Sequence, residues 1–215
     1  MASVRKKKTR GSVFIISAPS GAGKSTLCTG LMGSLENIRP SVSYTTRAPR
    51  HGEVNDVHYT FISEKKFRNM IGRGEFAEWA EVHGNLYGTS AKRLKSLIRA
   101  GVDILLDIDV QGADKIRTSL EDGVYIFIMP PSLKVLRSRL EKRMGHTRER
   151  PEDVARRLAK AREEMRRYNR YDYVIINDDL QTARREFESI IIAERLKSGL
   201  LDSRWVKKTI FQQEE

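Results

Sequence analysis

The chain has 215 residues, of which 39% are hydrophobic, so it is long enough to bury one sizeable core. The formal net charge of +12 indicates anionic partners, either nucleic acid or small polyphosphates, and charge alone does not separate the two. The single cysteine, Cys28, excludes an internal disulfide. No apolar run approaches the roughly 20 residues of a membrane span, and the N-terminus lacks an export signal. We therefore expect a cytoplasmic protein without a membrane partner.

Two polar segments flank the region that carries the regular patterns. Residues 1–10 contain the run Arg-Lys-Lys-Lys-Thr-Arg and are expected to form a disordered basic tail, with a nucleic-acid-binding arm as the alternative. Residues 198–215 form a C-terminal extension that places Trp205 and Phe211 among charges, and they could either dock or fray. Neither segment decides between a monomer and a homo-oligomer.

The stretch around which the chain is organised covers residues 11–26, Gly-Ser-Val-Phe-Ile-Ile-Ser-Ala-Pro-Ser-Gly-Ala-Gly-Lys-Ser-Thr. Its apolar start predicts a buried strand, the proline and glycines predict a loop, and a helix is expected to follow. In such a loop the backbone N–H groups bind phosphates, the lysine reaches the outer phosphates, and the next hydroxyl ligates Mg²⁺. The expected phosphate-binding residues are Ala18, Pro19, Ser20, Gly21, Ala22, Gly23, Lys24, Ser25 and Thr26. Ala18 stands where the strict pattern has glycine.

Three further apolar runs, over residues 102–109, 124–129 and 173–176, predict buried strands. Helical patterns alternate with them, among others over residues 25–35 and 180–196. Alternation of strands and helices predicts an α/β fold, in which a parallel sheet of the P-loop NTPase type carries helices on both faces.

Carboxylates end the strand expected over residues 102–109. The carboxyl ends of parallel strands share one edge of the sheet with the glycine loop, so Asp107 and Asp109 are expected near it. This position suits a contact with Mg²⁺ or with substrate. The alternative is that the acids only cap the next helix, an interpretation that we favour for Asp114 over the other two.

Residues 41–90 predict a compact insertion between two strand–helix units. Short strands and turns surround one helix in this segment, a pattern that suits a lid or a substrate-holding lobe. The chain is expected to break just before it, at Arg39 and Pro40. The expected strands cover residues 41–46, 58–62 and 76–82, and the helix covers residues 64–73.

The segment over residues 137–170 is rich in arginine. Residues 144–153 are polar, contain a glycine and a proline, and predict a mobile connection between two helices. Arginines on two helices beside such a connection can close over a phosphate chain, because each guanidinium binds phosphate through two N–H groups. For any single arginine here, a solvated helix face is the alternative.

Several motifs in this order, SAPSGAGKST, SVSYTTRAPR, GEFAEWAEVHGNLYGTS, DILLDIDVQG and VIINDD, resemble the guanylate kinase family. The resemblance covers nearly all of residues 11–196. It implies a core P-loop domain over residues 11–40, 91–143 and 154–197, a GMP-binding insertion over residues 41–90, and a mobile lid around the connection at residues 144–153. The lid connection is a few residues longer than is usual in the family, and Asp56-Val57-His58 departs from the usual residues before Tyr59.

The resemblance also implies the reaction and the acceptor site. The family transfers the γ-phosphoryl group of ATP to GMP, and here we expect dGMP as well, in purine nucleotide metabolism with ATP and Mg²⁺ as cofactors. By motif position, the GMP phosphate is expected to contact Arg47, Arg50, Tyr59 and Tyr87. The guanine base is expected to contact Ser43, Glu78, Thr89 and Asp109. Carboxylates suit the N–H donors of guanine and hydroxyls suit its O6 acceptor, whereas adenine would leave these groups unpaired.

On the ATP side, the resemblance implies three arginines and two residues that contact adenosine. The arginines expected to reach the ATP phosphates and the transferred group are Arg139, Arg143 and Arg157, and the adenosine contacts are Asn177 and Asp178. Ser25 and Asp107 are the candidates for the Mg²⁺ site. The residues expected to act in catalysis are Lys24, Arg50, Arg143 and Arg157.

Three other functions are weighed against this kinase. A protein-binding module of the same shape that has lost catalysis is disfavoured, because such modules typically lose the phosphate loop and Gly23-Lys24-Ser25 is intact here. A nucleic-acid-binding protein would use the basic charge and would bind in a salt-dependent way. A kinase with a different acceptor is disfavoured by Glu78 and Asp109.

Overall fold

The computed structural model describes residues 8–82, 84–144 and 151–211. Five parallel strands form a central sheet in the order β2-β7-β1-β8-β9. Their bounds are β1 (Val13–Ser17), β2 (Ile38–Pro40), β7 (Asp103–Asp107), β8 (Val124–Met129) and β9 (Tyr173–Ile176). All five residues of β1 are buried, because β1 lies at the centre of the sheet.

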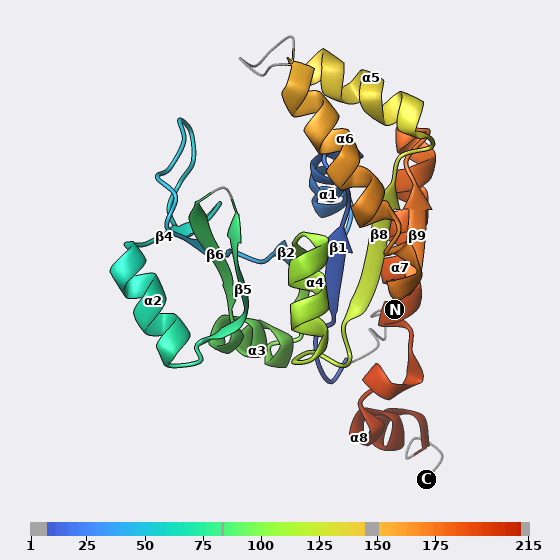
Figure 1. Ribbon diagram of the computed structural model, residues 1–215. Helices are drawn as coiled ribbons and strands as arrows, with labels where there is room; N and C mark the ends of the chain where they lie inside the picture. The colour runs from blue at the N-terminus through green and yellow to red at the C-terminus, as the bar shows by residue number, and fades with distance from the viewer. Residues whose placement is uncertain (1–7, 83, 145–150, 212–215) are drawn as a thin grey trace.

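Helices cover both faces of this sheet (Figure 1). Alternate residues of β1 point to opposite faces. Phe14 and Ile16 pack with α1 (Lys24–Met32) and α7 (Leu180–Arg195), while Val13 and Ile15 pack with α3 (Ala91–Arg99) and α4 (Val110–Arg117). The predicted α/β fold, a parallel sheet with helices on both faces, is confirmed.

A second sheet of four strands stands beside the core as a separate lobe (Figure 1). Its order is β4-β3-β6-β5, and helix α2 (Glu64–Gly72) packs on it. The strands are β3 (Tyr44–Thr45), β4 (Thr60–Phe61), β5 (Phe76–Val82) and β6 (Asn85–Ser90). Only the β3–β4 pair is parallel.

Strand β6 was not predicted. It contains Gly88 and several small polar residues, which weaken the usual signal of a strand. Gly88 is needed because Phe67 and Phe76 press against its backbone: a Cβ atom there would lie 2.9 Å from Phe76 Cδ1 and 3.0 Å from Phe67 Cζ. Side chains distant in sequence therefore decide the residue at this position.

The break predicted at Arg39 and Pro40 falls where β2 ends, but the strand itself was not predicted. Both residues belong to β2, which pairs with β7 at the edge of the central sheet. A proline disfavours a central strand but is tolerated at an edge, because one side of an edge strand needs no ladder hydrogen bond.

Helices α5 (Leu133–Met144) and α6 (Pro151–Met165) form a pair at the end of the central sheet where β8 leads into α5 (Figure 1). Their contact is a small apolar cluster of Leu136, Leu140, Val154, Leu158 and Ala161. Of the connection expected over residues 144–153, residue 144 and residues 151–153 belong to the helices, and residues 145–150 lie outside the described residues.

Part of the tail expected over residues 1–10 is attached to the core. Lys8 pairs with Leu201 and forms an ion pair of 2.9 Å with the buried carboxylate of Asp103, and Arg10 lies 2.6 Å from Asp122. The expectation of disorder is therefore wrong for residues 8–10, and residues 1–7 lie outside the described residues.

The C-terminal extension contains three short helical segments, η2 (Ser198–Leu200), α8 (Ser203–Val206) and η3 (Lys207–Phe211). Asp202 caps α8 by accepting hydrogen bonds from the backbone of Arg204 and Trp205. Within the described ranges, no helix is long and apolar enough to span a membrane.

Candidate nucleotide-binding site

The loop between β1 and α1 presents backbone donors at the start of a helix. Gly21 and Gly23 adopt φ angles of 88° and 95°, which residues other than glycine rarely adopt. Gly23 is the N-cap of α1 and provides no side-chain hydrogen bond to the first turn. The first N–H groups of α1 therefore remain available to an anion, and the positive end of the helix dipole favours one.

Two predicted ATP contacts, Arg139 and Asn177, hydrogen-bond to the backbone of this loop and hold it in place. The amide of Asn177 donates a hydrogen bond of 2.7 Å to the carbonyl of Ala22, and the Arg139 guanidinium donates to the carbonyls of Ala22 (3.4 Å) and Asn177 (2.9 Å). A Cβ atom at Gly23 would lie 2.2 Å from the amide nitrogen of Asn177. The packing behind the loop thus requires glycine at this position.

Lys24 points to the end of β7. Its ammonium forms an ion pair with Asp107 and lies 3.4 Å from the carbonyl of Ile108. The Lys24 side chain is 20% exposed and the Asp107 side chain is 46% exposed, so Asp107 can reach solvent or a ligand. Over the described ranges, no group of three or more histidine, cysteine or acidic residues could hold a metal ion.

A cavity of about 630 Å³ adjoins the loop. All of the predicted loop residues except the buried Ala22 line it, together with Arg139, Asn177 and Asp178. The lining also includes Asp109, which was assigned to the base, and two residues that were not predicted, Glu164 and Leu180. The structure therefore brings the predicted ATP residues of three separate segments, the loop, Arg139 and Asn177 with Asp178, to one place.

The two remaining arginines of the predicted ATP side lie on the helix pair. Arg157 is on α6, is half-buried, and does not line the cavity. Arg143 belongs to α5, and its side chain lies outside the described part of the structure. The roles assigned to these two residues stay predictions.

A buried carboxylate lies in the second sheet. Glu78 on β5 is 8% exposed and accepts a hydrogen bond of 2.7 Å from the hydroxyl of Thr89 on β6. Burial raises the pKa of Glu78 above its ordinary value, and the nearby Asp109 contributes to the rise, whereas the hydrogen bond from Thr89 opposes it. A Cβ atom built on Gly112 would lie 3.3 Å from Asp109 Oδ1 and 3.5 Å from Glu78 Oε2, so both carboxylates approach one point.

Asp109, rather than Asp114, caps the helix that follows β7. Its carboxylate accepts a hydrogen bond of 2.8 Å from the N–H of Gly112 and is the N-cap of α4. Asp114 lies in the middle of α4 and forms ion pairs of 2.8 Å with Arg167 and Arg170. The interpretation that favoured Asp114 as the cap is wrong, because α4 begins before Gly112 rather than after it.

Three of the four predicted contacts of the GMP phosphate, Arg47, Tyr59 and Tyr87, gather in one cluster. Arg47 lies over the ring of Tyr59, with Cζ 5.4 Å from its centroid, and Tyr59 makes an edge contact with Tyr87 at 6.0 Å between centroids. Burial raises the pKa of Tyr59, with a contribution from Tyr87. The Arg50 side chain is exposed, and its backbone N–H lies 2.7 Å from Glu53 Oε2.

Glu53 was not predicted and holds this cluster together. Its second oxygen accepts a hydrogen bond of 2.8 Å from Arg47. The hydrogen bonds from Arg47 and from the backbone of Arg50 lower the pKa of Glu53 to about 2, so the carboxylate is ionised at neutral pH. Ser43, the last predicted base contact, is half-buried just before β3, and its carbonyl accepts a hydrogen bond of 2.9 Å from Thr60.

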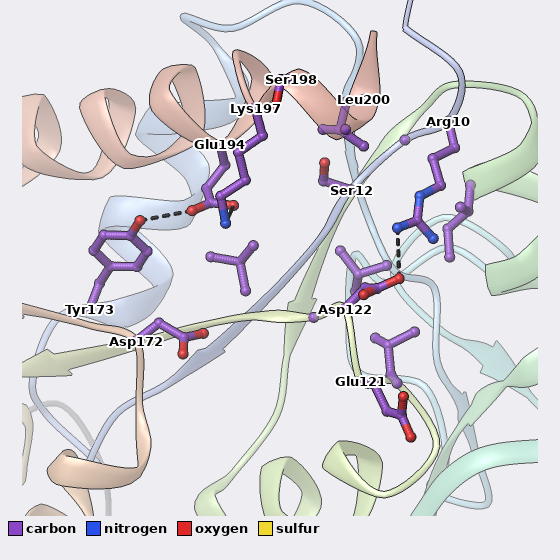
Figure 2. Close-up of a pocket in the computed structure, with 17 residues that line it drawn as sticks. Arg10, Ser12, Glu121, Asp122, Asp172, Tyr173, Glu194, Lys197, Ser198 and Leu200 are labelled. Atoms are coloured by element: carbon purple, nitrogen blue, oxygen red, sulfur yellow. Dashed lines mark hydrogen bonds and ion pairs between the residues drawn. The ribbon is translucent and has the colours of Figure 1, made fainter. Parts of the chain in front are cut away.

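A second cavity, of about 740 Å³, lies at the opposite edge of the central sheet. Figure 2 shows two pairs among its lining residues: Tyr173 donates a hydrogen bond of 2.8 Å to Glu194, and Arg10 lies 2.6 Å from Asp122. It contains no glycine-rich loop before a helix. The phosphate-binding geometry thus belongs to the edge that carries Lys24.

The fold and the loop together define a nucleotide-binding protein of the P-loop NTPase type. A family model described as guanylate kinase matches residues 10–194. Guanylate kinases of Geobacter metallireducens and Neisseria meningitidis are 49% and 47% identical to this chain; the alignments cover 89% and 87% of it and 93% and 90% of the relatives. The crystal structure of guanylate kinase from Anaplasma phagocytophilum superimposes with a TM-score of 0.74 at 35% identity, covering 96% of this chain and 98% of that one. The chain belongs to the guanylate kinase family, and the resemblance seen in its motifs is confirmed.

Proposed function

We propose that this chain transfers the γ-phosphoryl group of ATP to GMP or dGMP and releases ADP and the nucleoside diphosphate. The observation that carries this proposal is the position of Asp109. It lines the cavity of the phosphate loop and also lies beside the buried Glu78–Thr89 pair. A donor site and a base-reading site therefore adjoin, as transfer between two nucleotides requires.

Guanine is the base that best fits the acceptor side. The N1–H and N2–H₂ groups of guanine donate to carboxylates, and Glu78 and Asp109 supply two that approach one point. Thr89 holds Glu78 in place by donating its one hydroxyl proton to it, and Ser43 can donate from its hydroxyl to O6. Adenine lacks both of those donors, so it would leave two carboxylates unpaired, at a cost of about 1–3 kcal/mol for each.

The GMP phosphate is assigned to the cluster of Arg47, Arg50, Tyr59 and Tyr87. Arg47 is already oriented by Glu53 and by the Tyr59 ring. Two guanidinium groups and two phenolic hydroxyls supply enough donors for a dianionic phosphate. Because that phosphate is ionised, its attack needs no strong general base.

Catalysis is then positioning and charge stabilisation. The loop N–H groups and Lys24 act on the phosphates of ATP, and Arg143 and Arg157 are assigned to the transferred group. Asn177 and Arg139 keep the loop in shape, as their hydrogen bonds to Ala22 indicate. Closing the α5–α6 pair would exclude the water that otherwise hydrolyses ATP.

Ser25 and Asp107 are the residues that would hold Mg²⁺. Their donor set fits, because Mg²⁺ in phosphate sites takes one or two protein oxygens and keeps its other positions for phosphates and water. Asp107 lies beside Lys24, whose neighbour Ser25 lines the cavity. When bound, Mg²⁺ neutralises phosphate charge.

The parts of the chain are assigned accordingly. Residues 11–40, 91–143 and 154–197 form the core, residues 41–90 the GMP-binding insertion, and residues 144–153 the lid connection. We place the activity in the cytoplasm and in purine nucleotide metabolism. Its partners are the nucleotides, and nucleic acid is the disfavoured alternative that the basic charge leaves open.

The test is a coupled assay of ADP formation with ATP and a panel of monophosphates. GMP and dGMP should be used, and AMP should show a kcat/KM at least about 10²-fold lower, because two unpaired carboxylates act together. Equal use of AMP and GMP would contradict the assignment of Glu78 and Asp109. If no monophosphate accepts the phosphoryl group, the proposed kinase activity is contradicted.

A further inference from the structure

One acidic side chain enters the phosphate-binding cavity from the helix pair. Glu164, at the end of α6, is 8% exposed and lines the cavity together with Gly21, Lys24 and Asp109. Carboxylates are rarely buried, and a buried negative charge repels a polyphosphate unless a cation compensates it. Glu164 is therefore unfavourable both for folding and for ATP binding if it acts alone.

The sequence places Glu164 on the buried face of α6. Ala161, three residues earlier and therefore on the same face, packs against α5 in the apolar cluster of the helix pair. This cluster abuts the loop, since a Cβ atom at Gly21 would lie 3.0 Å from Leu140 Cδ2 and 3.1 Å from Leu136 Cδ1. The next position of the face thus meets the phosphate cavity, where the chain has Glu164 instead of an apolar residue.

Two lysines are available as counter-ions. Lys160 lies 3.7 Å from Glu164, but its side chain is 54% exposed, and an ion pair with an exposed lysine is weak. Lys24 lies inside the cavity, and its side chain is 20% exposed. Burial raises the pKa of Glu164 and Asp109 adds to the rise, whereas Lys160 and Lys24 act in the opposite direction.

Lys24 is bound to Asp107 in this structure, and under the proposed function its ammonium moves toward the outer phosphates when ATP binds. We propose that Glu164 is a positioning residue that holds the Lys24 ammonium in the cavity when ATP draws it away from Asp107. The inference rests on the proposed kinase function. Because α6 belongs to the helix pair that would close over ATP, the position of this carboxylate depends on closure.

The test compares Glu164→Gln, which keeps the shape and removes the charge, with Glu163→Gln at the exposed neighbouring position. We expect kcat to fall about tenfold in the first variant, with KM for GMP unchanged. Its melting temperature should be equal to or higher than that of wild type, because a buried charge is removed. Glu163→Gln should match wild type in both measurements.

Two further variants identify the cation. Lys160→Met should keep kcat within about twofold of wild type. Binding of a non-hydrolysable ATP analogue should be weakened by Glu164→Gln in the wild-type background. In a Lys24→Ala background the same change should leave binding unchanged or strengthen it, since the favourable effect passes through Lys24 and an uncompensated Glu164 repels the phosphates. Three results would overturn the proposal. They are an unchanged kcat in Glu164→Gln, a loss of kcat in Lys160→Met as large as in Glu164→Gln, and an equally large weakening of analogue binding by Glu164→Gln when Lys24 is absent. If the wild type fails to phosphorylate GMP, the kinase function fails, and the binding experiment still reports on Glu164.

Discussion

The proposed ATP side and the proposed GMP side of the site are built in different ways. The ATP side consists of backbone N–H groups at the start of α1, and side chains such as Asn177 and Arg139 hold the loop from behind. The proposed GMP side consists of side chains of the second lobe, including the buried Glu78 and the Arg47 cluster. A backbone site recognises phosphate in any nucleotide, whereas a side-chain site can recognise one base.

This difference predicts where each kind of substitution acts. Changes on the ATP side should alter rate for every acceptor, because the phosphate chain is common to all of the reactions. Changes on the GMP side should alter the choice of acceptor and leave ATP binding unchanged. Kinetics with two acceptors and one donor therefore separate the two sides.

The largest effect is expected for Lys24→Ala. Loss of the ammonium removes charge stabilisation from the transferring phosphate, and kcat should fall by about 10³-fold. The fold should persist, because the Asp107 carboxylate left behind is 46% exposed and can be solvated. The measurement is kcat with GMP and with IMP, together with a thermal melt. A variant with near-normal turnover would show that the loop does not act on the phosphates.

The second prediction concerns Glu78→Gln on the GMP side. The amide keeps the shape, removes the charge and adds a donor, so kcat/KM for GMP should fall by about 10²-fold while the ratio of GMP to AMP narrows. ATP affinity should not change. Glu81→Gln, on the same strand but exposed, is the matched control. An unaltered GMP to AMP ratio in Glu78→Gln would mean that this residue does not contact the base.

Glu78 also contributes a dependence on pH. Burial raises the pKa of Glu78 above that of an ordinary carboxyl group. As the pH falls, Glu78 is therefore protonated before an ordinary carboxylate is, and it then no longer accepts from the guanine N–H groups. The ratio of GMP to AMP use should therefore decline as the pH falls toward the pKa of Glu78. In Glu78→Gln that decline should be absent, because the amide does not titrate.

The sequence predicted the ATP side better than the GMP side, for a physical reason. A glycine loop between an apolar run and a helix is a local pattern, so the phosphate loop and its strand could be located from adjacent residues. Strand β6 depends on contacts with residues far along the chain, such as Phe67 against Gly88. Composition around Gly88 gives no equivalent signal. The N-cap role of Asp109 rests on a local bond from Gly112 and was missed because the start of α4 was placed too late in the sequence.

The unpredicted residues of the site show the same limit. Glu53 and Glu164 are acids in segments already rich in charge, where a solvated position is the ordinary expectation. Their importance follows from pairing with Arg47 and from burial in the cavity, and neither property can be read from adjacent residues. The residues proposed for the acceptor came from the guanylate kinase motifs, because a motif carries long-range contacts that spacing alone does not.

A moderate effect is expected for Arg157→Ala on α6. An arginine that engages the transferred group mainly as charge redistributes should change kcat more than KM for GMP, and we expect kcat to fall about tenfold. Arg156→Ala, the exposed neighbour that pairs with Asp153 on the same helix, is the control and should match wild type. Equal kinetics of the two variants would place Arg157 on a solvated face.

The smallest effect is expected for Glu53→Gln, which tests whether the phosphate cluster is prearranged. Glu53 bonds both Arg47 and the backbone of Arg50, so the neutral amide should loosen them and raise KM for GMP by no more than about fivefold, with kcat unchanged. Glu64→Gln, which removes an exposed pair with Arg68, should leave KM unaltered.

The pKa of Glu53 sets how this difference depends on pH. Its folded value of about 2 lies below the ordinary carboxyl value, so its bonds are fully present above that ordinary value and are lost only as the pH falls toward 2. The ratio of KM between Glu53→Gln and wild type should thus stay constant over about pH 5 to 9, because titration of the GMP phosphate affects both proteins equally. A lower KM in the variant would instead mean that Glu53 competes with the substrate phosphate for Arg47, and the acceptor side would not be prearranged in the way that the ATP side is.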